Sequence, residues 1–176
     1  LHLSKQELLS ISEICDSRAL IRIVAVGLNF KDVLNVLVPD EAGFIDGVPL
    51  PGTDFAGVVT ALPPQHADWG GQPLSIGDRV FGLSLQKEGV LRSFALVSPA
   101  SVVRVPPSLT LEEASQLPTV FLTAEHALSA QAKLTAGERI LIHSAAGGVG
   151  LAAVQYAQRV GAEVYATASP SKHEYL

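Results

Sequence analysis

Residues 140–168, ILIHSAAGGVGLAAVQYAQRVGAEVYATA, decide the fold of this chain. Apolar runs at 140–142 and 164–168 are typical of strands. Between them lies a segment with helical periodicity, with apolar side chains at Val149, Ala153, Tyr156, Ala157 and Val160 and polar ones at Gln155, Gln158 and Arg159. Gly161 stands where a helix end favours left-handed backbone. Strand, turn, helix and strand together fill about 30 residues, which is the size of a βαβ unit.

The turn of this unit predicts a dinucleotide site. Ala145, Gly147 and Gly150 occupy the three positions of a G-x-G-x-x-G pattern, with alanine in the first. These positions permit a tight turn, close approach of the backbone to a pyrophosphate, and close helix–strand packing. The amides that open the helix, at Gly148 and Val149, are expected to face the anion. A purely structural turn is the alternative, and the flanking strands and helix favour the nucleotide site.

The end of the second strand indicates which cofactor is bound. A site for NAD places a carboxylate there, about 20 residues after the glycines, to hold the ribose 2′-hydroxyl. Residues 167–172 contain no carboxylate, but they offer Ser169, Ser171 and Lys172. Two hydroxyls and a cation suit a 2′-phosphate, so we expect NADPH. The alternative is a solvated helix start, where serine is a common cap.

Composition excludes several classes of function. The 176 residues are 48% hydrophobic and 16% charged, with a net charge of −5, so no basic face for nucleic acid is expected. No apolar run approaches the roughly 18 residues of a membrane span. The one cysteine, Cys15, excludes an internal disulfide framework and predicts a reducing, cytoplasmic location.

The chain changes character near residues 110–120. Short strands are expected at 20–26, 55–62, 78–83, 93–97 and 102–105, with a short helix at 33–38. Thr110 and Glu113 have the spacing of a capping box, and a second helix is expected over 119–130, after Pro118. We therefore place one domain at 1–117 and another at 118–176. The absence of methionine, and an end inside an expected helix, predict a fragment.

Several motifs together resemble a known family. They are GLNFKD at 27–32, PGTDFAGVV at 51–59, GDRVFGL at 77–83, LPTVFLTAEHAL at 117–128, HSAAGGVGLAAVQYA at 143–157 and GAEVYATASPSKHEYL at 161–176. They are similar to the medium-chain dehydrogenase/reductase superfamily, and within it to the enoyl reductase domain of polyketide synthases. The resemblance implies a mixed fold, a GroES-like β-barrel followed by the first βαβ unit of a truncated Rossmann domain. The active site would lie between the two, and the fragment alone would be inactive.

Two departures from that family matter. Zinc-dependent members carry Gly-His-Glu where this chain has Gly52-Thr53-Asp54, and the five histidines show no metal-ligand spacing, so no metal is expected. Many polyketide enoyl reductases have Met-Tyr-Pro in a loop that reads VPDEAGF here, at 38–44. The tyrosine often linked to product stereochemistry is therefore missing.

The resemblance also implies roles for three single residues. Asn29 would lie near the nicotinamide as a catalytic residue, although it is also well placed to cap the following helix. Thr123 would bind the nicotinamide or its ribose, and its alternative is a helix threonine bonded to its own backbone. Lys172 would act either on the 2′-phosphate or as a catalytic proton donor, and the sequence leaves both open.

The function that follows is the NADPH-dependent reduction of the α,β double bond of an enoyl thioester. The substrate would be carried on the phosphopantetheine arm of an acyl carrier protein domain, beside neighbouring synthase domains. A free-standing quinone oxidoreductase shares most of these motifs and is the second interpretation. A truncated, non-catalytic remnant that binds nucleotide or packs against its neighbours is the third.

Overall fold

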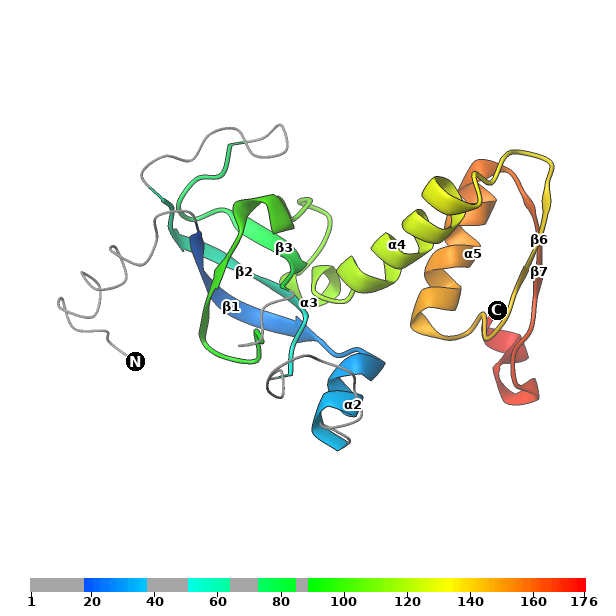
Figure 1. The fold of residues 1–176 in the computed structure, drawn as a ribbon, viewed down its shortest axis with the longest axis horizontal. Helices are drawn as coiled ribbons and strands as arrows, with labels where there is room; N and C mark the ends of the chain where they lie inside the picture. Colours follow the sequence, from blue (N-terminus) through cyan, green and yellow to red (C-terminus); the bar gives the residue numbers. More distant parts are fainter. Residues whose placement is uncertain (1–17, 38–50, 64–72, 85–88) are drawn as a thin grey trace. The chain divides into compact units, whose positions relative to one another are not determined.

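The computed structural model describes residues 18–37, 51–63, 73–84 and 89–176. The chain forms two compact units, Leu1–Pro118 and Thr119–Leu176 (Figure 1). Cys15 and the loop at 38–44 lie outside the described residues.

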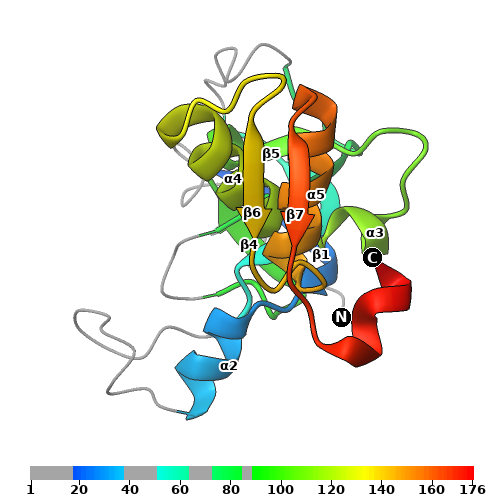
Figure 2. The same ribbon diagram turned by 90° about the vertical axis from the view of Figure 1, so that its right-hand side faces the viewer.

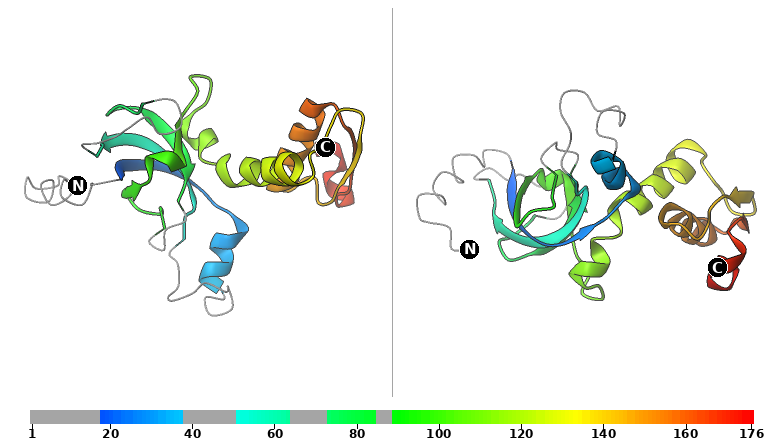
Figure 3. Two further views of the ribbon diagram at one scale, coloured as in Figure 1. Left: turned by 45° about the horizontal axis from the view of Figure 1, so that its top comes forward. Right: turned by 90° about the horizontal axis from the view of Figure 1, so that it is seen from below.

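An antiparallel sheet builds the first unit. Its strands are β1 (Ala19–Gly27), β2 (Asp54–Ala61), β3 (Arg79–Leu83), β4 (Phe94–Val97) and β5 (Val102–Arg104), in the order β4-β1-β2-β3-β5. The sheet curls strongly when seen end-on (Figure 3). All five expected strands form within one or two residues of their predicted bounds, which confirms the GroES-like half of the expected fold.

Apolar side chains fill both sides of this sheet. Ile21, Phe55, Val59 and Val80 are fully buried in one cluster. A smaller cluster of Ala56, Val105 and Ala114 lies where the one-turn helix α3 (Leu111–Ala114) contacts β1, β2 and β3. Because both faces of its central strands are covered, the sheet has an apolar core of its own.

The helix α2 (Phe30–Leu37) buries its polar residues. Asp32 and Asn35 are buried, while apolar side chains such as Phe30 are exposed. One carboxylate oxygen of Asp32 accepts from the backbone N–H of Gly52 (2.9 Å) and the other from that of Asn29 (2.8 Å). These charge-assisted bonds fix the helix start. The helix therefore begins three residues before the predicted Val33.

The second unit contains the expected βαβ arrangement. Its elements are α4 (Pro118–Glu125), the π-helix η2 (His126–Gln131), β6 (Arg139–Ile142), α5 (Gly148–Val160), β7 (Glu163–Ala166) and the 3₁₀ helix η3 (Pro170–Tyr175). β6 and β7 are parallel neighbours, and α4 and α5 lie on the same side of them (Figure 2). Gly161 ends α5 with a φ of 88°. The predicted strand–turn–helix–strand unit and its left-handed glycine are confirmed.

Small residues form the buried side of α5. Gly150, Ala152, Ala153 and Ala157 are buried there, whereas Val149, which we expected on the apolar stripe, is 44% exposed. Val149 sits in the first turn of α5, and the apolar stripe predicted from the periodicity was wrong at that position. The expected helix over 119–130 is also interrupted, because α4 changes to π-type bonding at His126.

The predicted capping box at the start of α3 is confirmed and gives a pH-dependent prediction. The Thr110 side chain accepts from the Glu113 N–H (3.1 Å), and the Glu113 carboxylate accepts from the N–H (2.8 Å) and hydroxyl (3.0 Å) of Thr110. The backbone bond first, and then the hydroxyl bond, hold the pKa of Glu113 below its ordinary value. This stabilising contribution is complete above that ordinary pKa and is lost as the pH falls through the lowered one.

We predict that Thr110→Ala raises the pKa of Glu113 only partly, because the larger cause, the backbone N–H, remains. Thr110→Ser keeps the hydroxyl and serves as the matched control, with a pKa close to that of the unmodified protein. Carbon-13 NMR titration of the Glu113 carboxyl measures both. An identical pKa in the alanine and serine variants would contradict the role given to the hydroxyl.

Candidate nucleotide-binding site

The turn between β6 and α5 allows no side chain at Gly150. A Cβ built there would lie 2.7 Å from the Cα of Ala145 and still closer to the carbonyl oxygen of Ser144. Ala145 itself is fully buried. The helix therefore packs directly on the turn that precedes it, which is the role expected of the third glycine in the pattern.

Gly147 has different surroundings. It is the N-cap of α5, and a Cβ there would meet only the carbonyl oxygen of Ser144, at 3.3 Å. No side chain caps this end of the helix. The backbone N–H groups of the first turn are left without the i−4 carbonyl partner that later turns have. The protein interior thus tolerates a side chain at Gly147 far better than at Gly150.

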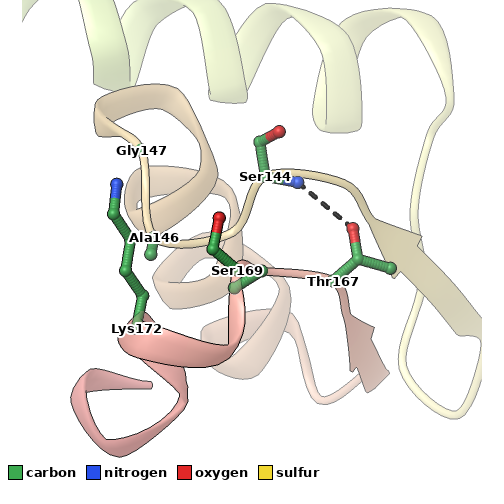
Figure 4. Close-up of a pocket in the computed structure, with 7 residues that line it drawn as sticks. Ser144, Ala146, Gly147, Thr167, Ser169 and Lys172 are labelled. Carbon is green, nitrogen blue, oxygen red and sulfur yellow. Dashed lines mark hydrogen bonds between the residues drawn. The ribbon is translucent and has the colours of Figure 1, made fainter.

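An open pocket of about 260 Å³ lies at the carboxyl ends of β6 and β7. It is lined by Ser144, Ala146, Gly147, Thr167, Ala168, Ser169 and Lys172. In Figure 4 the Lys172 side chain extends from η3 along the loop that carries Ala146 and Gly147, and Ser169 lies between η3 and that loop. The pocket therefore joins the start of α5 to the segment that follows β7.

Hydrogen bonds hold the two strand ends together at this pocket. The Thr167 N–H donates to the Ile142 carbonyl (3.0 Å), and the Thr167 carbonyl accepts from the Ala145 N–H (2.9 Å). The Thr167 hydroxyl oxygen accepts from the Ser144 N–H (3.3 Å) and lies 3.1 Å from Nδ1 of His143. Ser144 has a φ of 52°, an uncommon left-handed conformation for a residue with a side chain.

No lining residue of this pocket is acidic, and Lys172 is the basic one among them. The nearest carboxylate on β7, that of Glu163, stands at the opposite end of the strand and accepts from the Tyr165 hydroxyl (2.6 Å). That bond raises the pKa of Tyr165 above its ordinary value. The charge around the pocket thus suits an anion.

Only part of the sequence-predicted set lines the pocket. Gly147, Ser169 and Lys172 do, while Ala145 and Gly150 are buried and are not among its lining residues. Four predicted residues are exposed but are not lining residues: Gly148 and Val149 in the first turn of α5, Ser171 on η3 and Thr123 on α4. Sequence reasoning missed Ser144, Ala146, Thr167 and Ala168. Their signal was position alone: Ser144 and Ala146 follow the predicted strand at 140–142, and Thr167 and Ala168 are the last two residues of the predicted strand at 164–168, which ends at Ala166 in the structure.

Asn29 lies in the first unit, directly before α2. Its backbone N–H donates to Asp32, but its side-chain nitrogen is buried and has no hydrogen-bond partner. An unpaired buried polar group is costly and uncommon. The side-chain oxygen of Asn35, on α2, is likewise buried without a partner.

Within the described part of the chain, no group of three His, Cys, Asp or Glu side chains is placed to hold a metal ion. No helix there has the length and apolar character needed to cross a membrane.

The chain belongs to the alcohol dehydrogenase GroES-like domain family, whose model matches residues 16–107. It is 45% identical over 154 residues to the spectinabilin polyketide synthase system protein NorB of Streptomyces orinoci. It is also 45% identical over 158 residues to the pikromycin polyketide synthase component PikAII of Streptomyces venezuelae. These matches cover 86% and 89% of this chain but only 6% and 4% of the two synthases.

Solved structures with the same fold include two kinds of oxidoreductase. The CurK enoyl reductase is 42% identical with a TM-score of 0.77, and the match covers 90% of this chain and 48% of that one. The quinone oxidoreductase from Thermus thermophilus, whose complex with NADPH is known, is 33% identical with a TM-score of 0.70. That match covers 89% of this chain and 46% of that one. The expected resemblance to polyketide synthases and their enoyl reductases is confirmed.

The two glycines of the turn give a stability prediction. Gly150→Ala should lower the free energy of unfolding by about 1–3 kcal/mol, because the added methyl overlaps Ala145. The melting temperature of the protein should fall accordingly. Gly147→Ala, the matched control, should leave it nearly unchanged. Thermal unfolding followed by circular dichroism compares them. Equal melting temperatures for the two variants would show that the contact between α5 and the turn is not as tight as described.

Proposed function

We propose that the second unit binds NADPH at the pocket between α5 and η3. The observation that carries this proposal is the composition of the pocket: Gly147, at the uncapped start of α5, and Lys172 both line it, and no lining residue is acidic. A helix start of this kind favours phosphate oxygens. The residues present therefore fit an anionic dinucleotide better than a neutral ligand.

Each part of the cofactor has a matching group. The cofactor diphosphate would be held by the first-turn amides of Gly148 and Val149, with Gly147 leaving room for its approach. The 2′-phosphate would be held by Lys172 and Ser169, at the strand end where NAD sites place a carboxylate. Ser171 is on the same short helix, and we assign it to the outer edge of the phosphate site. Thr123, exposed on α4, remains assigned to the nicotinamide end.

We assign enoyl thioester reduction as the reaction. When bound, the cofactor would supply a hydride to the β-carbon of the substrate, and the resulting enolate would take up a proton at its α-carbon. Asn29 is the group of this chain that we assign to the reacting end, because its side-chain nitrogen is a buried donor without a partner. A donor aimed at an oxygen that gains negative charge stabilises the transition state.

Lys172 has two proposed roles, and its surroundings favour one. It lines the same pocket as Ser144, Ser169 and Thr167. The hydroxyl groups of these residues can hydrogen-bond a phosphate group. We therefore assign Lys172 to the 2′-phosphate and leave the proton to be delivered by another group. A proton-donating Lys172 would affect turnover more than cofactor affinity, so the two roles are separable by experiment.

The partners follow from the relatives. The similar chains in Streptomyces are polyketide synthase proteins, so we assign the substrate to an acyl carrier protein domain, with neighbouring synthase domains in the cytoplasm. The likeness to the Thermus thermophilus quinone oxidoreductase supports a second candidate, reduction of a small quinone. A nucleotide-binding remnant without activity is the third.

The cofactor assignment predicts a measurable preference. In the full-length protein NADPH should bind at least tenfold more tightly than NADH, about 1.4 kcal/mol. Lys172→Ala should remove most of that difference with little effect on NADH, whereas Ser171→Ala should have a small effect. Fluorescence titration with each cofactor gives the affinities. Equal affinities of the unmodified protein for the two cofactors would contradict the NADPH assignment.

The reaction assignment is tested with two substrates. The full-length protein should oxidise NADPH with an enoyl thioester, such as crotonyl-pantetheine, and much more slowly with a quinone. Asn29→Ala should lower kcat by about tenfold or more without changing NADPH affinity, because it removes a donor at the reacting end. Asn29→Asp, which has no donor, should behave like the alanine variant. Faster turnover of the quinone would favour the second candidate, and no turnover of either would favour the third.

A further inference from the structure

His143 does not line the pocket, yet it is bonded to a residue that does. It follows β6 directly, as Thr167 follows β7, and the two strands pair in parallel up to Ile142 and Ala166. This register brings Nδ1 of His143 to 3.1 Å from the Thr167 hydroxyl oxygen. Nothing in the proposed function so far uses this contact.

The Thr167 hydroxyl has two acceptor positions and one proton. One acceptor position is taken by the backbone N–H of Ser144. If Nδ1 of His143 carries a proton, it fills the second acceptor position, and the hydroxyl proton is then left for the pocket. If Nδ1 is instead an acceptor, the Thr167 hydroxyl donates its one proton to the imidazole ring. The hydroxyl can then only accept a hydrogen bond from a ligand.

We propose that His143 is a positioning residue that donates from Nδ1–H to Thr167, so that the Thr167 hydroxyl donates into the pocket. This inference rests on the proposed function, because it concerns the group that distinguishes NADPH from NADH. A phosphate oxygen only accepts hydrogen bonds, whereas a ribose hydroxyl also donates. A hydroxyl whose acceptor positions are both filled can only donate, so it complements a phosphate oxygen fully but a ribose hydroxyl only in its acceptor role.

In this arrangement the Thr167 hydroxyl is a hydrogen-bond donor for the phosphate, in addition to the positive charge of Lys172. Thr167 and Ser169 lie at the same strand end as Lys172 and line the same pocket. Other ionisable groups near this end are His173, whose Nε2 lies 3.1 Å from the Ala168 carbonyl oxygen, and Glu174, which is exposed on η3. His143 is the one of these whose side chain is hydrogen-bonded to a lining hydroxyl.

The test uses two amide variants of His143 in the full-length protein. The side-chain nitrogen of asparagine reaches the position of Nδ1, so His143→Asn should keep NADPH affinity within about twofold. His143→Gln carries its nitrogen one atom further, near the position of Nε2, and should lose about tenfold or more, as expected for one hydrogen bond to a charged group. The affinity for NADH should change little in either variant. Thermal unfolding confirms that both remain folded.

The same two His143 variants, made in a protein that also carries Thr167→Val, show whether His143 acts through Thr167 or contacts the nucleotide itself. Thr167→Val removes the hydroxyl, and in that background the difference between asparagine and glutamine at position 143 should disappear. If the difference persists without the hydroxyl, His143 contacts the nucleotide itself and the inference is overturned. Equal NADPH affinities for the asparagine and glutamine variants also overturn the inference on His143. In that case the proposed function still holds if the unmodified protein prefers NADPH to NADH. If the unmodified protein has no preference for NADPH, the proposed function fails, and the inference fails with it.

Discussion

The contact between α5 and the turn before it governs the second unit. With only hydrogen at Gly150, the helix backbone rests directly on Ala145 and starts immediately beyond the carboxyl ends of β6 and β7. Gly147 at the uncapped helix start, the residues after β7 and Lys172 on η3 then line one pocket. A side chain at Gly150 would force this helix start away from the strand ends, and the donors would no longer point toward a common ligand.

Glycine serves two purposes within four residues of this turn. At Gly150 the constraint is internal, because protein atoms occupy the space a side chain would need. At Gly147 the protein leaves most of that space open, so the constraint, in our account, comes from the ligand. The absence of acidic lining residues and the presence of Lys172 point to the same anion. Gly150 is thus required for the fold and Gly147 for the proposed binding of the ligand, although the two residues lie in the same turn.

The sequence predicts those features that depend on local patterns. The βαβ unit follows from periodicity and glycine spacing, and the Thr110 capping box from two residues three apart. Features that depend on tertiary contacts were missed. Thr167 meets Ser144 across 23 residues of chain, and α2 turns its polar face inward because Asp32 bonds to Gly52, 20 residues away. No local periodicity contains either contact.

The central claim is that an anionic dinucleotide lies across the start of α5 with its 2′-phosphate against Lys172. A crystal structure of the full-length protein with NADPH tests it most directly. Our account predicts the diphosphate within hydrogen-bond distance of the Gly148 and Val149 amides, and the 2′-phosphate within reach of Lys172, Ser169 and the Thr167 hydroxyl. A cofactor bound elsewhere, or bound here with its 2′-phosphate turned into solvent, would contradict it.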